Sequence, residues 1–147
     1  MPKIAGLKGR SLETYPNARR AGAVSTQSHV NLDAVGPLTT GLTSLLTAPI
    51  DVGPNTKALV MYSGVVSTSG PSVLVTVNVL VDGDVKYPLE IEVTSANSPA
   101  PFSLSFETDQ LGATPNPHTI DIQASASVGG DATVAANGSI VVLATAN

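Results

Sequence analysis

The chain of 147 residues has a formal net charge of −4, no cysteine and only 12% charged residues. This length fits one domain with a single core, and the lack of cysteine excludes disulfide scaffolds, thiolate zinc sites and cysteine nucleophiles. Valine is the most frequent residue, and 13 glycines and 11 prolines supply frequent turns. The composition therefore predicts an all-β domain.

The amino-terminal segment, residues 1–28, lacks the alternation of a strand, and we interpret it as an extended basic arm before a β domain at residues 29–147. Five of the seven basic residues lie in the first twenty positions, so residues 1–20 carry a charge of +4 and residues 21–147 carry −8. Such asymmetry is typical of an interaction arm, although a solvated leader or a cloning remnant would look similar. The candidate contact residues of the arm are Lys3, Lys8, Arg10, Tyr15, Arg19 and Arg20.

The chemistry of the arm restricts its partners. Five cations over twenty residues make few phosphate contacts, Tyr15 alone could stack on a base, and an acidic body repels a polyanion, so we expect no nucleic acid. An acidic protein surface is the favoured target. The amino terminus lacks the apolar core of a secretory signal, and the longest apolar run, Val73–Val81, is too short to span a bilayer. We therefore expect synthesis in a cytoplasm and no membrane partner.

Strand-like segments recur from His29 onward and are separated by turn residues. The first four are expected at His29–Ala34, Leu42–Val52, Lys57–Ser67 and Val73–Val81. Pro49 indicates that the second segment is an edge strand or contains a bulge. The third segment is apolar on both faces, as is typical of a central strand. The fourth has valine at every second position, which predicts one continuous buried face.

Asp82-Gly83 is a typical two-residue hairpin turn, after which the chain returns along Val85–Thr94. A second hairpin turn is expected at Asn137-Gly138. The remaining strands are expected at Phe102–Glu107, His118–Ala126, Ala132–Ala135 and Ser139–Thr145. Alternation predicts five buried side chains: Phe102, Leu104, Phe106, Ile120 and Ile122. No helical period is present, and these segments, the first of which alternates only weakly, amount to about eight antiparallel strands, which predict a single sandwich or barrel.

Patterns for catalysis and metal binding are weak. His29 and His118 have no metal-ligand spacing, so we interpret both as structural histidines and expect the His118 ring to bind a loop carbonyl. Asp82-Gly83-Asp84 lacks the later ligands of a calcium loop, and Asn137-Gly138-Ser139 is interpreted as a turn rather than a glycosylation site. With no nucleophile elbow, P-loop or dinucleotide fingerprint, the sequence predicts no enzyme, no metal and no cofactor.

The carboxy-terminal half has a recognisable order of strands and turns. Its matching residues are Pro117, His118, Thr119, Ile120, Ile122 and Ala124, then Gly129 and Gly130, then Gly138, Ser139 and Val142. On these residues, positions 44–147 resemble the trimeric jelly rolls of the tumour-necrosis-factor and complement-head type, a kind of domain that virus and phage capsid or fibre proteins also use. A jelly roll preceded by a basic arm looks most like a phage head decoration, or cement, protein.

The resemblance implies a single all-β jelly roll with an extended arm, acting as a structural virion protein. It implies a homotrimer that is made in the host cytoplasm, binds the major capsid protein at the outer capsid surface and stabilises the shell through its arm. Three charge-free stretches agree with self-association, because they could face a neighbour without burying a charge: residues 58–81, 93–106 and 132–147. The alternative is a fibre-tip or receptor- or carbohydrate-binding trimeric head, which an exposed aromatic platform would favour.

Overall fold

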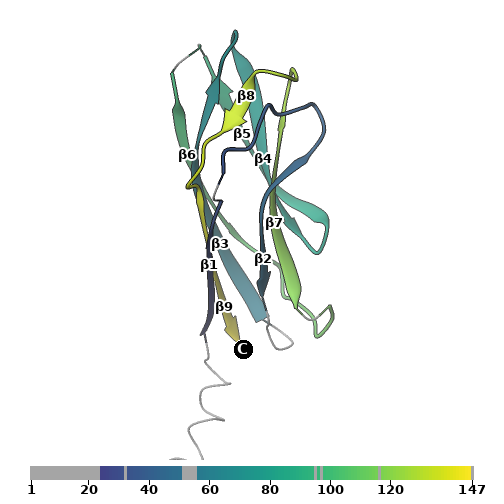
Figure 1. Ribbon diagram of the computed structural model, residues 1–147. Helices are drawn as coiled ribbons and strands as arrows, with labels where there is room; N and C mark the ends of the chain where they lie inside the picture. The colour runs from purple at the N-terminus through teal and green to yellow at the C-terminus, as the bar shows by residue number, and fades with distance from the viewer. Residues whose placement is uncertain are drawn as a thin grey trace, which may run out of the picture.

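Two antiparallel β-sheets pack face to face in the computed structural model (Figure 1). The structure describes residues 24–31, 33–50, 56–94, 96, 98–115 and 117–146. These residues form nine strands, and none of them belongs to a helix that could cross a membrane. The prediction of an all-β jelly-roll sandwich is confirmed, with nine strands where about eight were expected.

The first sheet has the strand order β1-β9-β3-β6, with the short β8 also paired to β3. Its strands are β1 (Val24–Val30), β3 (Thr56–Thr68), β6 (Ala100–Glu107), β8 (Ala132–Val134) and β9 (Ser139–Ala146). The second sheet has the order β2-β7-β4-β5 and consists of β2 (Thr43–Ile50), β4 (Val73–Val81), β5 (Asp84–Val93) and β7 (His118–Ala126). Apart from the β4–β5 and β8–β9 links, each connection crosses between the sheets, which is the winding of a jelly roll.

Strand alternation directs one side of each sheet into the space between them. The valines at the odd positions of β4 are at most 6% exposed, which confirms the continuous face predicted for this strand. On the neighbouring β7, Ile120 and Ile122 are fully buried. Tyr62 on β3 is the largest fully buried side chain and fills the core from the opposite sheet.

The β6 side chains point inward as predicted, but not all of them are fully buried. Leu104 is buried, whereas Phe102 and Phe106 are half-buried, so the prediction of full burial is wrong for the two phenylalanines. The reason is that β6 is an edge strand, so a ring on it has a neighbouring strand on one side only. Phe102 packs against Tyr62 and Phe106 against Tyr87, with ring centroids 5.6 and 5.7 Å apart.

The first strand begins before the expected boundary of the arm. Residues 24–28 were assigned to the arm, yet β1 pairs with β9 from Val24 opposite Thr145 to Val30 opposite Ser139. The sequence of β1, VSTQSHV, lacks the apolar alternation by which a strand is recognised, because an edge strand can be held by backbone pairing without a strongly apolar face. The structure thus moves the start of the sheet to Val24, and the candidate contact residues of the arm lie outside the described residues.

The two predicted hairpin turns have different outcomes. Asp82 and Gly83 adopt φ values of 51° and 90° and join β4 to β5, as predicted. Asn137-Gly138 is not a hairpin turn, because β8 and β9 both pair antiparallel with β3 and so run in the same direction. The chain between them is held by Asn31, whose carbonyl accepts from the Asn137 N–H at 2.8 Å and whose N–H donates to the Gly138 carbonyl at 3.0 Å.

Candidate functional site

The outward face of the β1-β9-β3-β6 sheet is mostly uncharged among the described residues, and we call it the uncharged face. Because side chains alternate along a strand, β3, β6 and β9 each send every second residue to this side. The residues that define it are Leu59, Met61, Ser63, Val65, Ser103, Ser105, Ser139, Val141 and Leu143. Its apolar members are half-buried in the single chain, so part of each apolar side chain is still in contact with water.

The strand register arranges this face in rows across the sheet. One row consists of Ser105, Met61 and Val141, and the adjacent row consists of Ser103, Ser63 and Ser139. The hydroxyl oxygens of Ser63 and Ser139 are 3.4 Å apart. A shallow groove of about 370 Å³ lies over these two rows, so the face combines an apolar floor with short hydroxyl groups that can donate or accept.

Among the residues of β3, β6 and β9, only Lys57 and Glu107 are charged, and both lie at one end of the uncharged face. There, Lys57 Nζ lies 3.4 Å from Glu107 Oε1, with both side chains more than half exposed. An exposed pair of this kind contributes little to stability, because water and salt screen it. The rest of the face can be covered by another surface without removing an ion from water.

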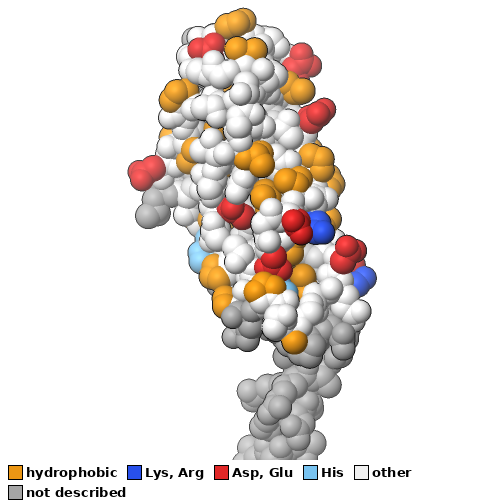
Figure 2. All heavy atoms as spheres, turned by 90° about the vertical axis from the view of Figure 1, so that its right-hand side faces the viewer, with side chains coloured by type: hydrophobic (Ala, Val, Ile, Leu, Met, Phe, Trp, Pro, Cys, Tyr) orange, Lys and Arg blue, Asp and Glu red, His pale blue; other side chains and the backbone are white. Residues whose placement is uncertain are grey.

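The outward side of the β2-β7-β4-β5 sheet is acidic by contrast. Glu90 and Glu92 are exposed on β5, and the Asp121 carboxylate on β7 accepts hydrogen bonds from two β2 hydroxyls and from Gln123. Figure 2 shows a side of the molecule on which acidic side chains outnumber basic ones. Like charges repel a second copy of the same surface, so the uncharged face is the better suited of the two to self-association.

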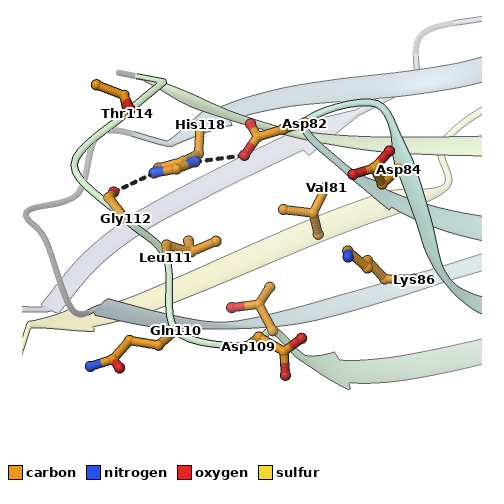
Figure 3. A pocket seen from close by; sticks show the side chains of 11 residues that line it. Val81, Asp82, Asp84, Lys86, Asp109, Gln110, Leu111, Gly112, Thr114 and His118 are labelled. Atoms are coloured by element: carbon orange, nitrogen blue, oxygen red, sulfur yellow. Dashed lines mark hydrogen bonds and ion pairs between the residues drawn. The ribbon is translucent and has the colours of Figure 1, made fainter.

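A second candidate site surrounds His118, which lies at the start of β7 beside a pocket of about 220 Å³ (Figure 3). Its ring has a partner on each side: Nδ1 is 2.7 Å from Asp82 Oδ2, and Nε2 is 2.8 Å from the Gly112 carbonyl oxygen. Burial disfavours the charged ring, but the hydrogen bonds to Asp82 and Gly112 and the Asp82 charge outweigh it and raise the His118 pKa above its ordinary value.

The loop carbonyl predicted for His118 is therefore Gly112, and that prediction is confirmed. The contact with Asp82 was not predicted, because the Asp82-Gly83 turn pattern already explained the aspartate locally. The other histidine, His29, lies in the other sheet, and its Nε2 atom is buried without a hydrogen-bond partner. Within the described part of the chain, no three metal-ligating side chains gather at one point.

The aromatic side chains within the described ranges pack in pairs rather than forming a platform. Tyr62 is buried against Phe102, and the half-buried Tyr87 stacks on Phe106. Tyr15, the remaining aromatic residue of the sequence, lies outside the described residues. The exposed aromatic surface that would favour a receptor-binding head is thus not found on the described surface.

Comparisons with known proteins identify a fold rather than a family. No protein-family model matches the chain, and no curated protein sequence matches it. Among solved structures, T=1 particles derived from infectious bursal virus match with a TM-score of 0.60 and 15% identity, over 82% of this chain and 31% of the viral chain. Dimeric latent PorU from Porphyromonas gingivalis matches with a TM-score of 0.58 and 14% identity, over 85% of this chain and 13% of PorU.

The Eiger TNF structure from S. frugiperda also aligns, with a TM-score of 0.49 and 11% identity over 84% of this chain and 92% of that chain. The present chain spans less than a third of the viral chain and of PorU. At such identities, the likeness to the viral particle and to PorU shows a shared fold alone. That fold is the jelly-roll winding described above.

Proposed function

We propose that this chain is a structural virion protein, a homotrimeric jelly roll that binds the outer surface of a capsid and stabilises it through its amino-terminal arm. The observation that carries the proposal is the uncharged face. In this proposal the uncharged face makes the contacts between copies of the chain, and the arm makes the contacts with the capsid shell. In this proposal the protein is a decoration, or cement, protein of a bacteriophage, and it has no enzymatic activity.

Self-association through the uncharged face would remove apolar area from water without removing ions. In a cyclic trimer every subunit buries the same residues around the three-fold axis, and a one-sided uncharged face can supply that surface on each subunit. Leu59, Met61 and Val141 would lie in the contact, and the serine hydroxyls between them can pair with groups of a neighbour. The acidic outward side of the second sheet would then remain in solvent and keep neighbouring trimers apart.

Attachment to the capsid is assigned to the arm, whose partner would be the major capsid protein. Its cations, Lys3, Lys8, Arg10, Arg19 and Arg20, suit an acidic protein surface and would speed docking by electrostatic attraction. Tyr15 supplies one aromatic contact. The arm precedes β1 in the chain, and β1 begins at the end of the sandwich where β9 ends (Figure 1). An extended chain reaches up to about 3.3 Å per residue, enough to cross from one capsid subunit to the next.

The fold is compatible with this role, because the infectious bursal virus particle uses a similar jelly roll within a longer chain. PorU shows that the same fold also occurs elsewhere, so the fold alone does not carry the proposal. The receptor-binding alternative lacks support on the described surface, where the aromatic rings are already paired.

The test is sedimentation of bare capsids after incubation with the full chain or with a chain lacking residues 1–23. We expect the full chain to sediment at a fixed ratio to the capsid protein and the shortened chain to remain in the supernatant. Replacing the five arm cations by serine should weaken binding and flatten its salt dependence, because exposed charges are screened within about 8 Å at physiological ionic strength.

The matched control replaces the two lysines of the β domain, Lys57 and Lys86, by serine, which leaves the arm intact. This control should bind like the wild type. Equal sedimentation of the full and the shortened chain would refute the role of the arm, and no sedimentation of either would refute capsid decoration.

A further inference from the structure

Three separate segments meet at the His118 ring. Asp82 belongs to the turn between β4 and β5, Gly112 belongs to the loop between β6 and β7, and His118 opens β7. The His118 side chain is only 3% exposed, and its two ring nitrogens face Asp82 and Gly112 rather than open solvent. Asp82 Oδ1 also accepts from the Thr119 N–H at 2.9 Å, which fixes the carboxylate in place.

The two ring partners are both acceptors. A backbone carbonyl can only accept, so Nε2 must carry a proton to bind Gly112. A carboxylate also accepts, so Nδ1 must carry a proton to bind Asp82. Both contacts are hydrogen bonds at once only when the ring is an imidazolium. A neutral ring has one proton for two acceptors and must give up one of them.

The carboxylate is the stronger acceptor of the two, because its hydrogen bond is charge-assisted. A neutral ring therefore keeps its proton on Nδ1 facing Asp82, and the Nε2 lone pair then faces the Gly112 carbonyl oxygen. The other charged groups around this pocket are Asp84 and Lys86 on β5 and Asp109 in the β6–β7 loop. None of these three has a hydrogen bond to the ring within the described contacts, so none replaces the lost one.

We propose that His118 is a proton-operated latch, in which the imidazolium fastens the β6–β7 loop to the β4–β5 turn and loss of its proton releases the loop at Gly112. The first part of the loop has anchors of its own. The Thr108 N–H donates to the Ala58 carbonyl at 2.8 Å, and the Leu111 N–H donates to the Thr56 carbonyl at 2.6 Å. Release is therefore confined to the stretch after Leu111, which forms a wall of the pocket (Figure 3).

The direction of the switch follows from the raised His118 pKa. A histidine whose pKa is higher in the folded state stabilises that state below its ordinary value of 6.5, and this contribution is lost as the pH rises through the raised pKa. The latch is thus closed in mildly acidic solution and opens as the pH increases.

The substitution Asp82→Asn distinguishes a latch from a histidine that is buried but does not control the loop. The side-chain NH₂ that this substitution introduces can donate to a neutral Nδ1, while the amide oxygen still accepts from Thr119. The ring can then keep a proton on Nε2 for Gly112 at every pH. Asparagine also tolerates the positive φ of this turn position. The matched control is Asp84→Asn, which removes the same charge from the same pocket without touching the ring.

The experiment measures two quantities by NMR across the titration of His118. The ring nitrogen resonances report its protonation and tautomer, and the backbone order parameters of Gly112, Ala113 and Thr114 report loop order. In the wild type and in Asp84→Asn, we expect loss of the ring proton from Nε2 together with a fall of the order parameters from about 0.85 toward about 0.6. In Asp82→Asn, we expect the neutral ring to be the Nε2–H tautomer, and the loop to stay ordered on both sides of the titration.

The latch is overturned if the wild-type loop stays ordered when His118 loses its proton. A neutral wild-type ring with its proton on Nε2 would also overturn it, as would an Asp82→Asn loop that opens with the same pH dependence as the wild type.

Discussion

Met61→Glu is the sharpest test of the uncharged face as a contact between copies. Met61 lies outward on β3 between Ser105 and Val141, so a carboxylate at this position would enter the centre of the proposed contact. The closest cation along the strand is Lys57, four residues away and therefore about 13 Å distant. This separation exceeds the screening length of about 8 Å, so Lys57 gives the new charge little compensation.

The magnitude follows from burying an uncompensated ion. Leaving one buried charge without a partner costs about 3–5 kcal/mol. Because 1.4 kcal/mol is a factor of ten, even one such charge raises the dissociation constant more than about 100-fold, and a trimer contains three copies. The fold itself should tolerate the change, since the Met61 side chain is outside the core.

The assay is the molar mass from light scattering at micromolar concentration, together with the melting temperature. We expect a trimeric mass for the wild type and a monomeric mass for Met61→Glu at a nearly unchanged melting temperature. The matched control is Leu74→Glu, which adds the same charge to an exposed position of β4 on the opposite sheet and should stay trimeric. A trimeric Met61→Glu, or a monomeric wild type, would refute the reasoning.

Three further predictions concern stability. Gly138→Ala should lower the free energy of unfolding by about 1–3 kcal/mol in urea titrations, because an added Cβ would lie 2.6 and 2.7 Å from two side-chain oxygens; an unchanged midpoint would contradict this. Ile122→Ala should lower the free energy of unfolding by about 2–5 kcal/mol, more than Phe106→Ala does, because Ile122 is fully buried and Phe106 is half-buried. Equal losses of stability in the two variants would show that burial depth does not determine the loss. Deleting residues 1–23 should leave the melting temperature nearly unchanged, whereas deleting residues 1–28 should lower it, because the longer deletion removes most of β1. Identical melting curves for the two deletions would show that β1 does not contribute to the stability of the fold.

The alternation of apolar and polar residues predicted the strands that bury one clearly apolar side. Val73–Val81 and His118–Ala126 have the predicted bounds, because every second residue is apolar and the other sheet buries that side. Alternation also gave the inward direction of Phe102 and Phe106, but not their depth, which depends on β6 being an edge strand. Strand order is set by pairing between distant segments, and no local pattern reports it.

The same distinction applies to the candidate sites. The charge-free stretches of the sequence made an uncharged surface foreseeable, but only the register shows that Met61, Ser105 and Val141 share one row. Asn137-Gly138 has the local chemistry of a hairpin turn, and its role changes because β8 and β9 share β3 as partner. His118 and Asp82 are 36 positions apart, so their contact is a product of the fold.

If the protein decorates a capsid as proposed, many copies lie close together, and the prolines in the edge strands then affect how those copies can associate. Three of the four edge strands contain an exposed proline: Pro49 in β2, Pro88 in β5 and Pro101 in β6. Proline has no N–H for a ladder, so these edges resist the addition of a foreign strand and the fibre growth that would follow. The fourth edge strand, β1, contains no proline, so it is the edge at which proline does not block the pairing of a further strand.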